Sequence, residues 1–538
     1  MYKLLALLCL STFCLGQGQS GQQITYKGPL TVIHTDPVTL TPDNPGIFHY
    51  YIDHDGKRDS LGDFTGGPQL GPIQTGTVVE ATGTQQNNGS LSRAHIKPPP
   101  PPPQISVAGA QATLVLMVNF SDYTLQPYTS AQIASAFSAS SNFVLENSYE
   151  TAWLVPTVVG WLTIPDSITA CNIGTIATDA KTAATAAGVN LGSYTHYVYF
   201  FPFDNACPFG GASDVGGNPS ESWINGTVDP HVLNHELGHA FGLWHAHLFD
   251  CGSTSTICSS PNIVEYGDLI DVMGKPQTAS PDYSAFQHEL LGWLNLGTLP
   301  SIQTITTSGV YTLKPIENGT GPNALKILKG TDSTGAKVYY YLEQRQAVGF
   351  DSFLSDSFYT SGTQNETTGI LFHLGTAGDS NSDDLLDMSP STNAQFFFDS
   401  ALQVNQTYTD SAAGVSITPL SVTSTTSSVQ VNFGNTQSGT LSCSAHPLAA
   451  SYTSGDTSSI DIHVTNNLGN VVSGASVTQT LTKTNGASAH QSCSSNSGGD
   501  AVCVYKIKGN DPLGTWSAAE SVSQGTLSTS CNTTFLVN

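Results

Sequence analysis

The stretch "VDPHVLNHELGHAFGLWHAH", Val228 to His247, decides the fold of the region around it. Asp229 and Pro230 predict a helix start, because the aspartate can cap the first turn and proline lacks an N–H that would have no partner there. Gly242 can adopt a positive φ, so the helix is expected to end near Phe241 and turn sharply. The spacing therefore predicts a helix of about three turns followed by a tight turn.

This helix and turn would gather three histidines. His235 and His239 are four residues apart and project from one helix face, and the turn at Gly242 brings His245 round to join them. Three protein ligands leave a fourth position for water, which is typical of a catalytic zinc site. Glu236 stands beside the first ligand, placed to act as general base on that water. The predicted metal ligands are His235, His239 and His245, and the predicted cofactor is Zn²⁺.

The same histidines could also belong to a helix without a metal. Such a helix accounts for His235 and His239 but leaves Gly242 and His245 without a purpose. His231 and His247 flank the motif as rival ligands, and we expect both to lie behind the ligands or towards the substrate. A similar run from His288, "HELLG", has glycine where the second histidine should stand and is interpreted as structural.

Downstream, "EYGDLIDVMG" places Met273 in a short turn 28 residues after His245. A methionine near a glycine is usually ordinary core packing. After an extended zinc motif, however, it is typical of a Met-turn, in which the thioether packs beneath the metal-binding histidines. Tyr266 and Tyr283 are near in sequence and are weak candidates to assist catalysis.

Phrases on both sides of the motif carry a family resemblance: "LVLMVNFSD", "ENSYETAW", "CPFGGASDVGGNPSESWIN", "YGDLIDVMG", "FQHELLGWL", "YYLEQRQAVGFD" and "LLDMSPST". Over roughly 105–435 the chain resembles gametolysin-type metallopeptidases of the metzincin clan, with weaker similarity to the immune-inhibitor-A type. The resemblance implies an α+β metzincin-like domain and an extracellular matrix or cell-wall glycoprotein as substrate. Some gametolysin-type members have Gln at the first zinc position, where this chain has His235.

Composition limits the function. The 538 residues include only 16 Lys+Arg against 40 Asp+Glu, a formal net charge of -24, which excludes a nucleic-acid binder because little could neutralise phosphates. Residues 1–20 read as a secretory signal peptide, since their apolar run is shorter than the ~20 residues of a membrane anchor. We therefore expect a secreted or surface-associated protein without a membrane span.

Eight cysteines lie beyond the signal, an even set that predicts disulfides in an oxidising compartment. Proximity in sequence suggests Cys171–Cys207, Cys251–Cys258 and two bridges within the last hundred residues.

The expected architecture is multidomain: an α+β metzincin-like zinc peptidase domain flanked by an N-terminal β domain and C-terminal β-sandwich domains. Turn-rich alternation predicts a β domain at 21–97, and six prolines form a polyproline II spacer within a linker at 98–104. Mixed helices and strands predict the catalytic domain at 105–299, a β-rich domain follows at 300–436, and an immunoglobulin-like domain at 437–538.

Residues 21–103 are either a pro-segment covering the zinc site or a permanent accessory module. The segment has no cysteine to donate to zinc, so a blocking ligand would be a carboxylate or histidine such as Asp53, His54, Asp55 or His95, unless the block is steric.

The sequence also bears on three further interpretations. "GGASDVGG" either offers edge backbone to an extended substrate or is a plain glycine loop. Calcium binding by Asp379, Asn381, Asp383 and Asp384 is disfavoured, because the loop glycine is missing and Pro390 replaces the bidentate Glu. A non-catalytic adhesin or carbohydrate-binding protein would not need Glu236 beside three histidines. The sequence thus predicts a secreted zinc metalloendopeptidase.

Overall fold

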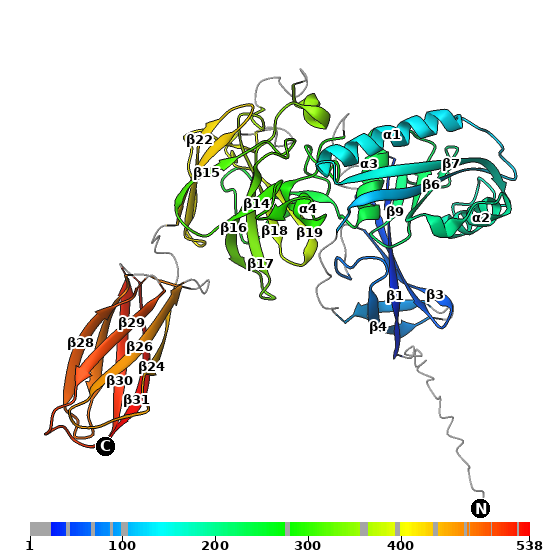
Figure 1. Cartoon of the computed structure of the whole chain (residues 1–538). Coiled ribbons are helices and arrows are strands. Elements are labelled where there is room, and N and C mark those ends of the chain that lie inside the picture. Colours follow the sequence, from blue (N-terminus) through cyan, green and yellow to red (C-terminus); the bar gives the residue numbers. More distant parts are fainter. Residues whose placement is uncertain are drawn as a thin grey trace, which may run out of the picture.

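The computed structural model describes residues 23–38, 44–65, 70–86, 90–97, 106–274, 280–355, 364–392, 399–433, 440–466, 471–472, 474–496, 498–524 and 527–538. The predicted signal peptide and the whole of the predicted proline-rich linker, 98–104, lie outside these residues. The chain is mostly β, with several sheets and few helices (Figure 1).

The first sheet has ten strands and joins the N-terminal segment to the region that holds the zinc motif. Its main order is β3-β2-β1-β9-β10-β8-β6-β7, and β4 and β5 branch from β1. β1 runs antiparallel to β9, whereas β10, β8, β6 and β7 are parallel. The strands are β1 (Gln23–Asp36), β2 (Ile47–His54), β3 (Lys57–Thr65), β4 (Val78–Gln85), β5 (Leu91–Ile96), β6 (Gly109–Phe120), β7 (Ala152–Ile164), β8 (His196–Phe201), β9 (Gly211–Asp214) and β10 (Ser220–Asn225).

Helices cover both faces of the parallel part of this sheet, α1 (Ser130–Asn147) and α3 (Pro230–Phe241) on one face and α2 (Ile173–Ala186) on the other (Figure 1). Successive β6 residues point to opposite faces: Val115 and Met117 pack with α1 and α3, and Leu114 and Leu116 pack with α2. Burial on both sides explains why this strand reads as an unbroken apolar run.

A second sheet of nine strands follows, in the main order β12-β11-β19-β18-β17-β16-β14-β13, with β20 beside β18. A four-stranded sheet, β15-β23-β22-β21, packs on it through the apolar cluster around Leu325, Phe372 and Val429. The short helix α4 (Ala285–Leu290) precedes most of these strands, which are β11 (Ala246–Asp250), β12 (Asn262–Val264), β13 (Asn295–Leu296), β14 (Ser301–Ile305), β15 (Gly309–Leu313), β16 (Pro322–Thr331), β17 (Lys337–Glu343), β18 (Gly369–Thr376), β19 (Asp379–Leu386), β20 (Leu402–Gln403), β21 (Tyr408–Asp410), β22 (Val415–Val422) and β23 (Ser427–Phe433).

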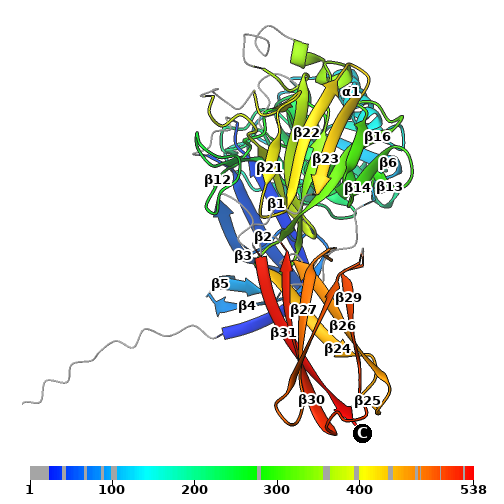
Figure 2. The ribbon, with the colours of Figure 1, turned by 90° about the vertical axis from the view of Figure 1, so that its left-hand side faces the viewer.

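The C-terminal region is a sandwich of a three-stranded sheet, β24-β26-β29, and a five-stranded sheet, β25-β31-β30-β27-β28 (Figure 2). Trp516 is fully buried between them. The strands are β24 (Leu441–Pro447), β25 (Ser451–Tyr452), β26 (Thr457–Asn466), β27 (Ser476–Thr482), β28 (Ser488–Ser494), β29 (Asp500–Lys506), β30 (Gly514–Gln524) and β31 (Leu527–Val537).

Four disulfides link residues of the described chain. Cys171–Cys207 and Cys251–Cys258 confirm the pairs predicted from proximity. Cys443–Cys531 and Cys493–Cys503 are the two expected near the C-terminus, and each joins one sheet of the sandwich to the other. Within the described residues, no helix combines the length and hydropathy needed to cross a bilayer.

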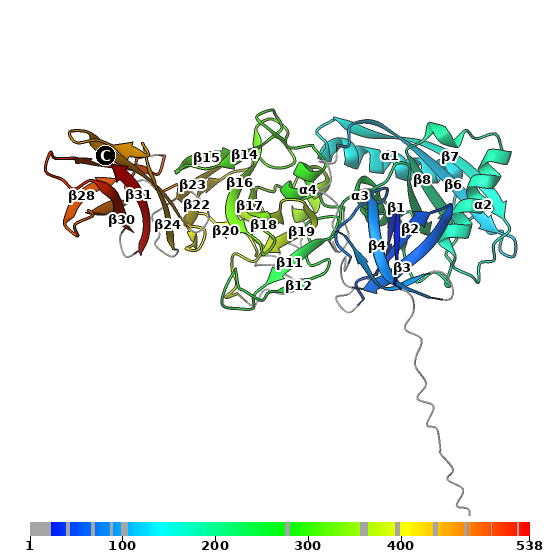
Figure 3. The same cartoon turned by 90° about the horizontal axis from the view of Figure 1, so that it is seen from below.

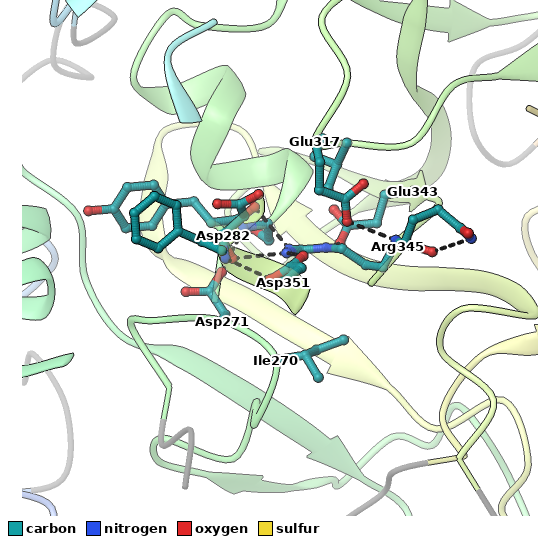
Figure 4. Close-up of polar contacts among 12 residues, drawn as sticks. Ile270, Asp271, Asp282, Glu317, Glu343, Arg345 and Asp351 are labelled. Atoms are coloured by element: carbon teal, nitrogen blue, oxygen red, sulfur yellow. Dashed lines mark hydrogen bonds and ion pairs between the residues drawn. The ribbon is translucent and has the colours of Figure 1, made fainter. Parts of the chain in front are cut away.

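Arg345, two residues after the end of β17, joins the second sheet to the zinc-motif region (Figure 4). Its guanidinium is fully buried and pairs with Glu343 and Asp351, each at 2.7 Å. It also donates to the backbone carbonyls of Asp282 and Tyr283, at 3.0 and 2.9 Å. Burial alone would lower the pKa of Arg345, but the carboxylates of Glu343 and Asp351 raise it, so the side chain stays charged. The buried cation therefore holds together the joint between the second sheet and the segment of Asp282 and Tyr283.

We expect R345M to lower the free energy of unfolding by about 3–5 kcal/mol, because it leaves two buried carboxylates without their cation. Urea unfolding of the full chain measures the change. K337M is the matched control, since Lys337 is exposed on the same part of the chain, and its effect should stay within about 0.5 kcal/mol. Equal midpoints for the two variants would show that these ion pairs do not hold the joint.

Candidate metal centre

Helix α3 begins and ends where the sequence predicts. The Asp229 side chain accepts a hydrogen bond from the His231 N–H at 2.9 Å, and Pro230 occupies the first turn. Gly242 has a φ of 104°, a left-handed conformation that only glycine adopts at little cost. The chain therefore leaves the helix in a sharp turn and runs through His245 into β11.

The three predicted ligands come together and are buried. The ring centroids of His235, His239 and His245 lie 4.8 to 5.3 Å apart, and their exposed fractions are 2%, 0% and 0%. The Nε2 atoms of His239 and His245 are 3.2 Å apart. The turn at Gly242 thus brings the third imidazole against the first two.

Each of the three rings is oriented by an acceptor at its Nδ1 atom. These hydrogen bonds run from His235 to the Val272 carbonyl at 2.7 Å, from His239 to the Leu243 carbonyl at 2.9 Å, and from His245 to the Glu265 carboxylate. Carbonyl and carboxylate oxygens only accept, so each neutral ring carries its proton on Nδ1 and presents a lone pair at Nε2.

Three lone pairs pointing into one buried space fit a metal ion. At zinc–nitrogen distances of ~2.0–2.1 Å, two ligands of a tetrahedral site lie about 3.3–3.4 Å apart. The 3.2 Å between the Nε2 atoms of His239 and His245 is close to that value. Two such nitrogens cannot hydrogen-bond to each other, and the buried Nε2 of His235 makes no hydrogen bond with any residue that the structure describes. The donor set therefore suits zinc.

Glu236 projects its carboxylate beside these histidines. Both of its oxygens are buried and have no hydrogen-bond partner among the described residues. Burial, and then the charge of Asp36, raise the pKa of Glu236 well above its usual range. Gly211 on β9 provides the space: a Cβ there would lie 2.0 Å from the Glu236 Oε1 atom.

Met273 lies beneath the histidine helix. A Cβ at Gly238, between His235 and His239 on α3, would come 2.3 Å from the Met273 sulfur. The turn is fixed by the Asp271 carboxylate, which accepts from the Met273 N–H at 2.7 Å. The Met273 carbonyl accepts from the Ala246 N–H at 3.0 Å. The thioether thus packs against the segment that carries the first two histidines.

Asp36, at the end of β1, was not among the predicted site residues. Its Oδ1 atom lies 3.3 Å from His235 Nε2 and 3.5 Å from His245 Nε2, and its Oδ2 atom lies 3.6 Å from His239 Nε2. Figures 1 and 3 show the N-terminal strands beside α3. Burial opposes ionisation, but His34 and then His235 hold the pKa of Asp36 well below its usual range.

Two side chains hold the Asp36 carboxylate. His34 contacts its Oδ2 atom through Nδ1 at 3.0 Å, and Tyr266 donates to its Oδ1 atom at 2.6 Å. His34 and Asp36, together with His239 and His245, form the group of ligand atoms in the described part of the chain that is compact enough to hold a metal ion. The only sequence signal was "HTD" at a strand end, where His34 and Asp36 share one face.

The rival histidines lie close to the predicted ligands or to their partners. His231 is partly buried next to His235, at 5.6 Å between ring centroids, and desolvation lowers its pKa to about 3. His247 contacts Glu265 and Asp384, at 3.3 and 3.4 Å. Glu265, which sequence reasoning missed, thus links His247 to the His245 ring.

The remaining candidates lie elsewhere. Tyr283 donates to the Asn234 carbonyl of α3 at 3.3 Å. His288 is buried on α4, and Glu289 pairs with Lys326 at 2.7 Å. Within the described residues, the Asp379–Asp384 run on β19 forms no group of ligand atoms compact enough for an ion.

Comparisons with known proteins support the family resemblance. Residues 125–360 match the family model described as gametolysin peptidase M11. No curated protein matches the chain. The weaker similarity to the immune-inhibitor-A type stays a prediction.

Solved structures are similar only at a low level. A DUF4785 family protein from Legionella pneumophila subsp. pneumophila str. Philadelphia 1 is 12% identical, covers 44% of this chain and 55% of its own, and has a TM-score of 0.16. A tetra-tandem repeat in the extending region of a large adhesion protein is 12% identical, covers 39% and 47%, and has a TM-score of 0.17. The chain thus spans about half the length of these structures, and at such TM-scores the likeness has no bearing on its fold.

The family match covers the whole of α3, the turn to His245 and Met273. In residues 125–360 the chain therefore carries a peptidase region of the gametolysin family.

Proposed function

We propose that the chain is a secreted zinc-dependent endopeptidase with a metzincin-like catalytic region. His235, His239 and His245 would hold the metal, Glu236 would be the general base, and Met273 would form the Met-turn beneath them. The observation that carries the proposal is the convergence of three unprotonated Nε2 atoms, each fixed by an acceptor at Nδ1. The four disulfides fit an extracellular location.

When bound, a zinc ion supplies Lewis acidity, which polarises a scissile carbonyl and lowers the pKa of the attacking water towards ~7. Glu236 takes the proton from that water and returns it to the leaving amine. Its carboxylate has no competing hydrogen bond within the described part of the chain, which supports this role over a structural one. A non-catalytic adhesin would have no use for a buried carboxylate without a partner.

Strand β9 is the proposed substrate-binding edge. It pairs with β10 on one side and with the extended strand β1 on the other. Gly211 on this strand lies against the Glu236 carboxylate, so a peptide paired with β9 would pass directly over the proposed base. An extended, unfolded region of an extracellular matrix or cell-wall glycoprotein is the proposed substrate.

E236Q is expected to reduce peptide hydrolysis by at least about a hundredfold while one zinc ion stays bound, because the residue is a base and not a ligand. The assay compares rates on a quenched peptide, under conditions in which the unsubstituted chain cleaves it, with metal content by mass spectrometry. E289Q is the matched control, since Glu289 stands in the similar "HELLG" run but pairs with Lys326. Substantial activity of E236Q would contradict the assigned base.

H245A should lose zinc affinity more strongly than H247A. His245 would be a ligand, whereas His247 acts through Glu265, and loss of such outer partners costs roughly 10- to 100-fold in affinity. Competition with a chromogenic chelator measures both values on the folded chain. The reverse order of affinities would assign the third ligand to His247.

A further inference from the structure

We propose that strand β1 is a built-in inhibitor and that Asp36 is the fourth zinc ligand in the uncut chain. The proposal rests on the proposed peptidase function, because it concerns the regulation of that same metal centre. It replaces the blocking groups considered from sequence: Asp53 pairs with Arg58, His54 pairs with Asp59, and the side chain of Asp55 is 97% exposed.

The first argument is geometric. An oxygen ligand at ~2.0–2.2 Å from zinc lies about 3.3–3.5 Å from each tetrahedral nitrogen ligand. The Asp36 Oδ1 atom is 3.3 and 3.5 Å from the Nε2 atoms of His235 and His245, and its Oδ2 atom is 3.6 Å from that of His239. The carboxylate therefore stands at the fourth corner, the position that a catalytic site leaves open for water or substrate.

The second argument is that the carboxylate is held in place. Tyr266 donates to Oδ1 from the zinc-motif region, and the His34 imidazole contacts Oδ2 from β1 itself. Asp36 is 6% exposed and His34 is fully buried, so water has little access to compete for the corner. A carboxylate fixed on both sides loses little conformational entropy when it binds the metal.

The third argument is that β1 occupies the proposed substrate edge. Residues 33–36 pair antiparallel with β9, from Ile33 opposite Asp214 to Asp36 opposite Gly211. The Gly210 N–H donates to the Asp36 carbonyl at 2.8 Å, and the Val215 N–H donates to the Val32 carbonyl at 2.9 Å. An extended peptide substrate would need these same backbone groups, so β1 and substrate exclude each other.

The N-terminal strands also contact the turn between His239 and His245. Phe48 stacks on Trp244 at 4.8 Å between ring centroids, and Trp244 is fully buried in the apolar cluster of these strands. The Gln74 side chain donates to the Gly242 carbonyl at 3.2 Å. The N-terminal strands are thus packed on the turn that positions His245. Asp36 is the residue of these strands that reaches the three histidines.

The test compares D36A, the nearly isosteric D36N and the control D55N in the full chain. Spectra are recorded with cobalt(II) in place of zinc on the E236Q background, which keeps the chain uncut. The visible absorption of cobalt depends on its ligands, so D36A and D36N should change the spectrum, and D55N should not. Acetohydroxamate, a small chelating probe, should alter the D36A spectrum at concentrations that leave the Asp36 chain unchanged.

Peptide hydrolysis is measured in parallel with Glu236 intact. D36A should cleave a short peptide at least about tenfold faster than the unsubstituted chain before any processing, and D55N should match the unsubstituted chain. Thermal unfolding checks that each variant folds. If D36A does not fold, D36N takes its place in both measurements. Metal-loaded chains with identical spectra and identical initial rates would overturn the role of Asp36 and leave the peptidase function standing. Absence of metal uptake in every chain, or an active E236Q, would instead refute the peptidase function and this inference with it.

Discussion

The structure around α3 depends on hydrogen bonds at the Nδ1 atoms of three buried imidazoles. Each bond fixes one ring and turns its Nε2 lone pair inward. Three such lone pairs in a space closed to water repel one another unless a cation lies between them. Gly211, Gly238 and Gly242 make the arrangement possible, because a side chain at the first two would collide with Glu236 or Met273 and the third must adopt a positive φ.

The sequence was informative wherever the determinant was local. Asp229 and Pro230 stand at the start of one helix and Gly242 directly follows it, so its ends were predicted correctly. The unbroken apolar runs of β6 and β8 are the pattern of strands that are buried on both faces, as in the parallel part of the first sheet. Cys171–Cys207 and Cys251–Cys258 followed from short separations, whereas the sandwich bridges could not be assigned, since four cysteines allow three pairings.

Asp36 could not be found from the sequence because its partners are distant in the chain. Its place depends on the pairing of β1 with β9, a register that no local pattern encodes. Sequence reasoning favoured polar residues at the turn near Asp55, yet these face solvent or one another. Glu265 was missed for the same reason, since its role appears only when the chain folds back on His245.

The pairing of β1 with β9 has a consequence for a chain from which the N-terminal segment has been removed, as the proposed inhibition requires. If β1 leaves, the ten-stranded sheet is split at β9, whose backbone N–H and carbonyl groups then face water, and Trp244 loses Phe48. An unpaired strand edge beside a bare aromatic side chain is a template for adding another chain. Short strands limit this hazard, and β9 has only four residues. The exposed edge of β9 is thus long enough to pair with a peptide but too short to pair strongly with a second copy of the chain. In the proposed peptidase, this favours binding of substrate over aggregation.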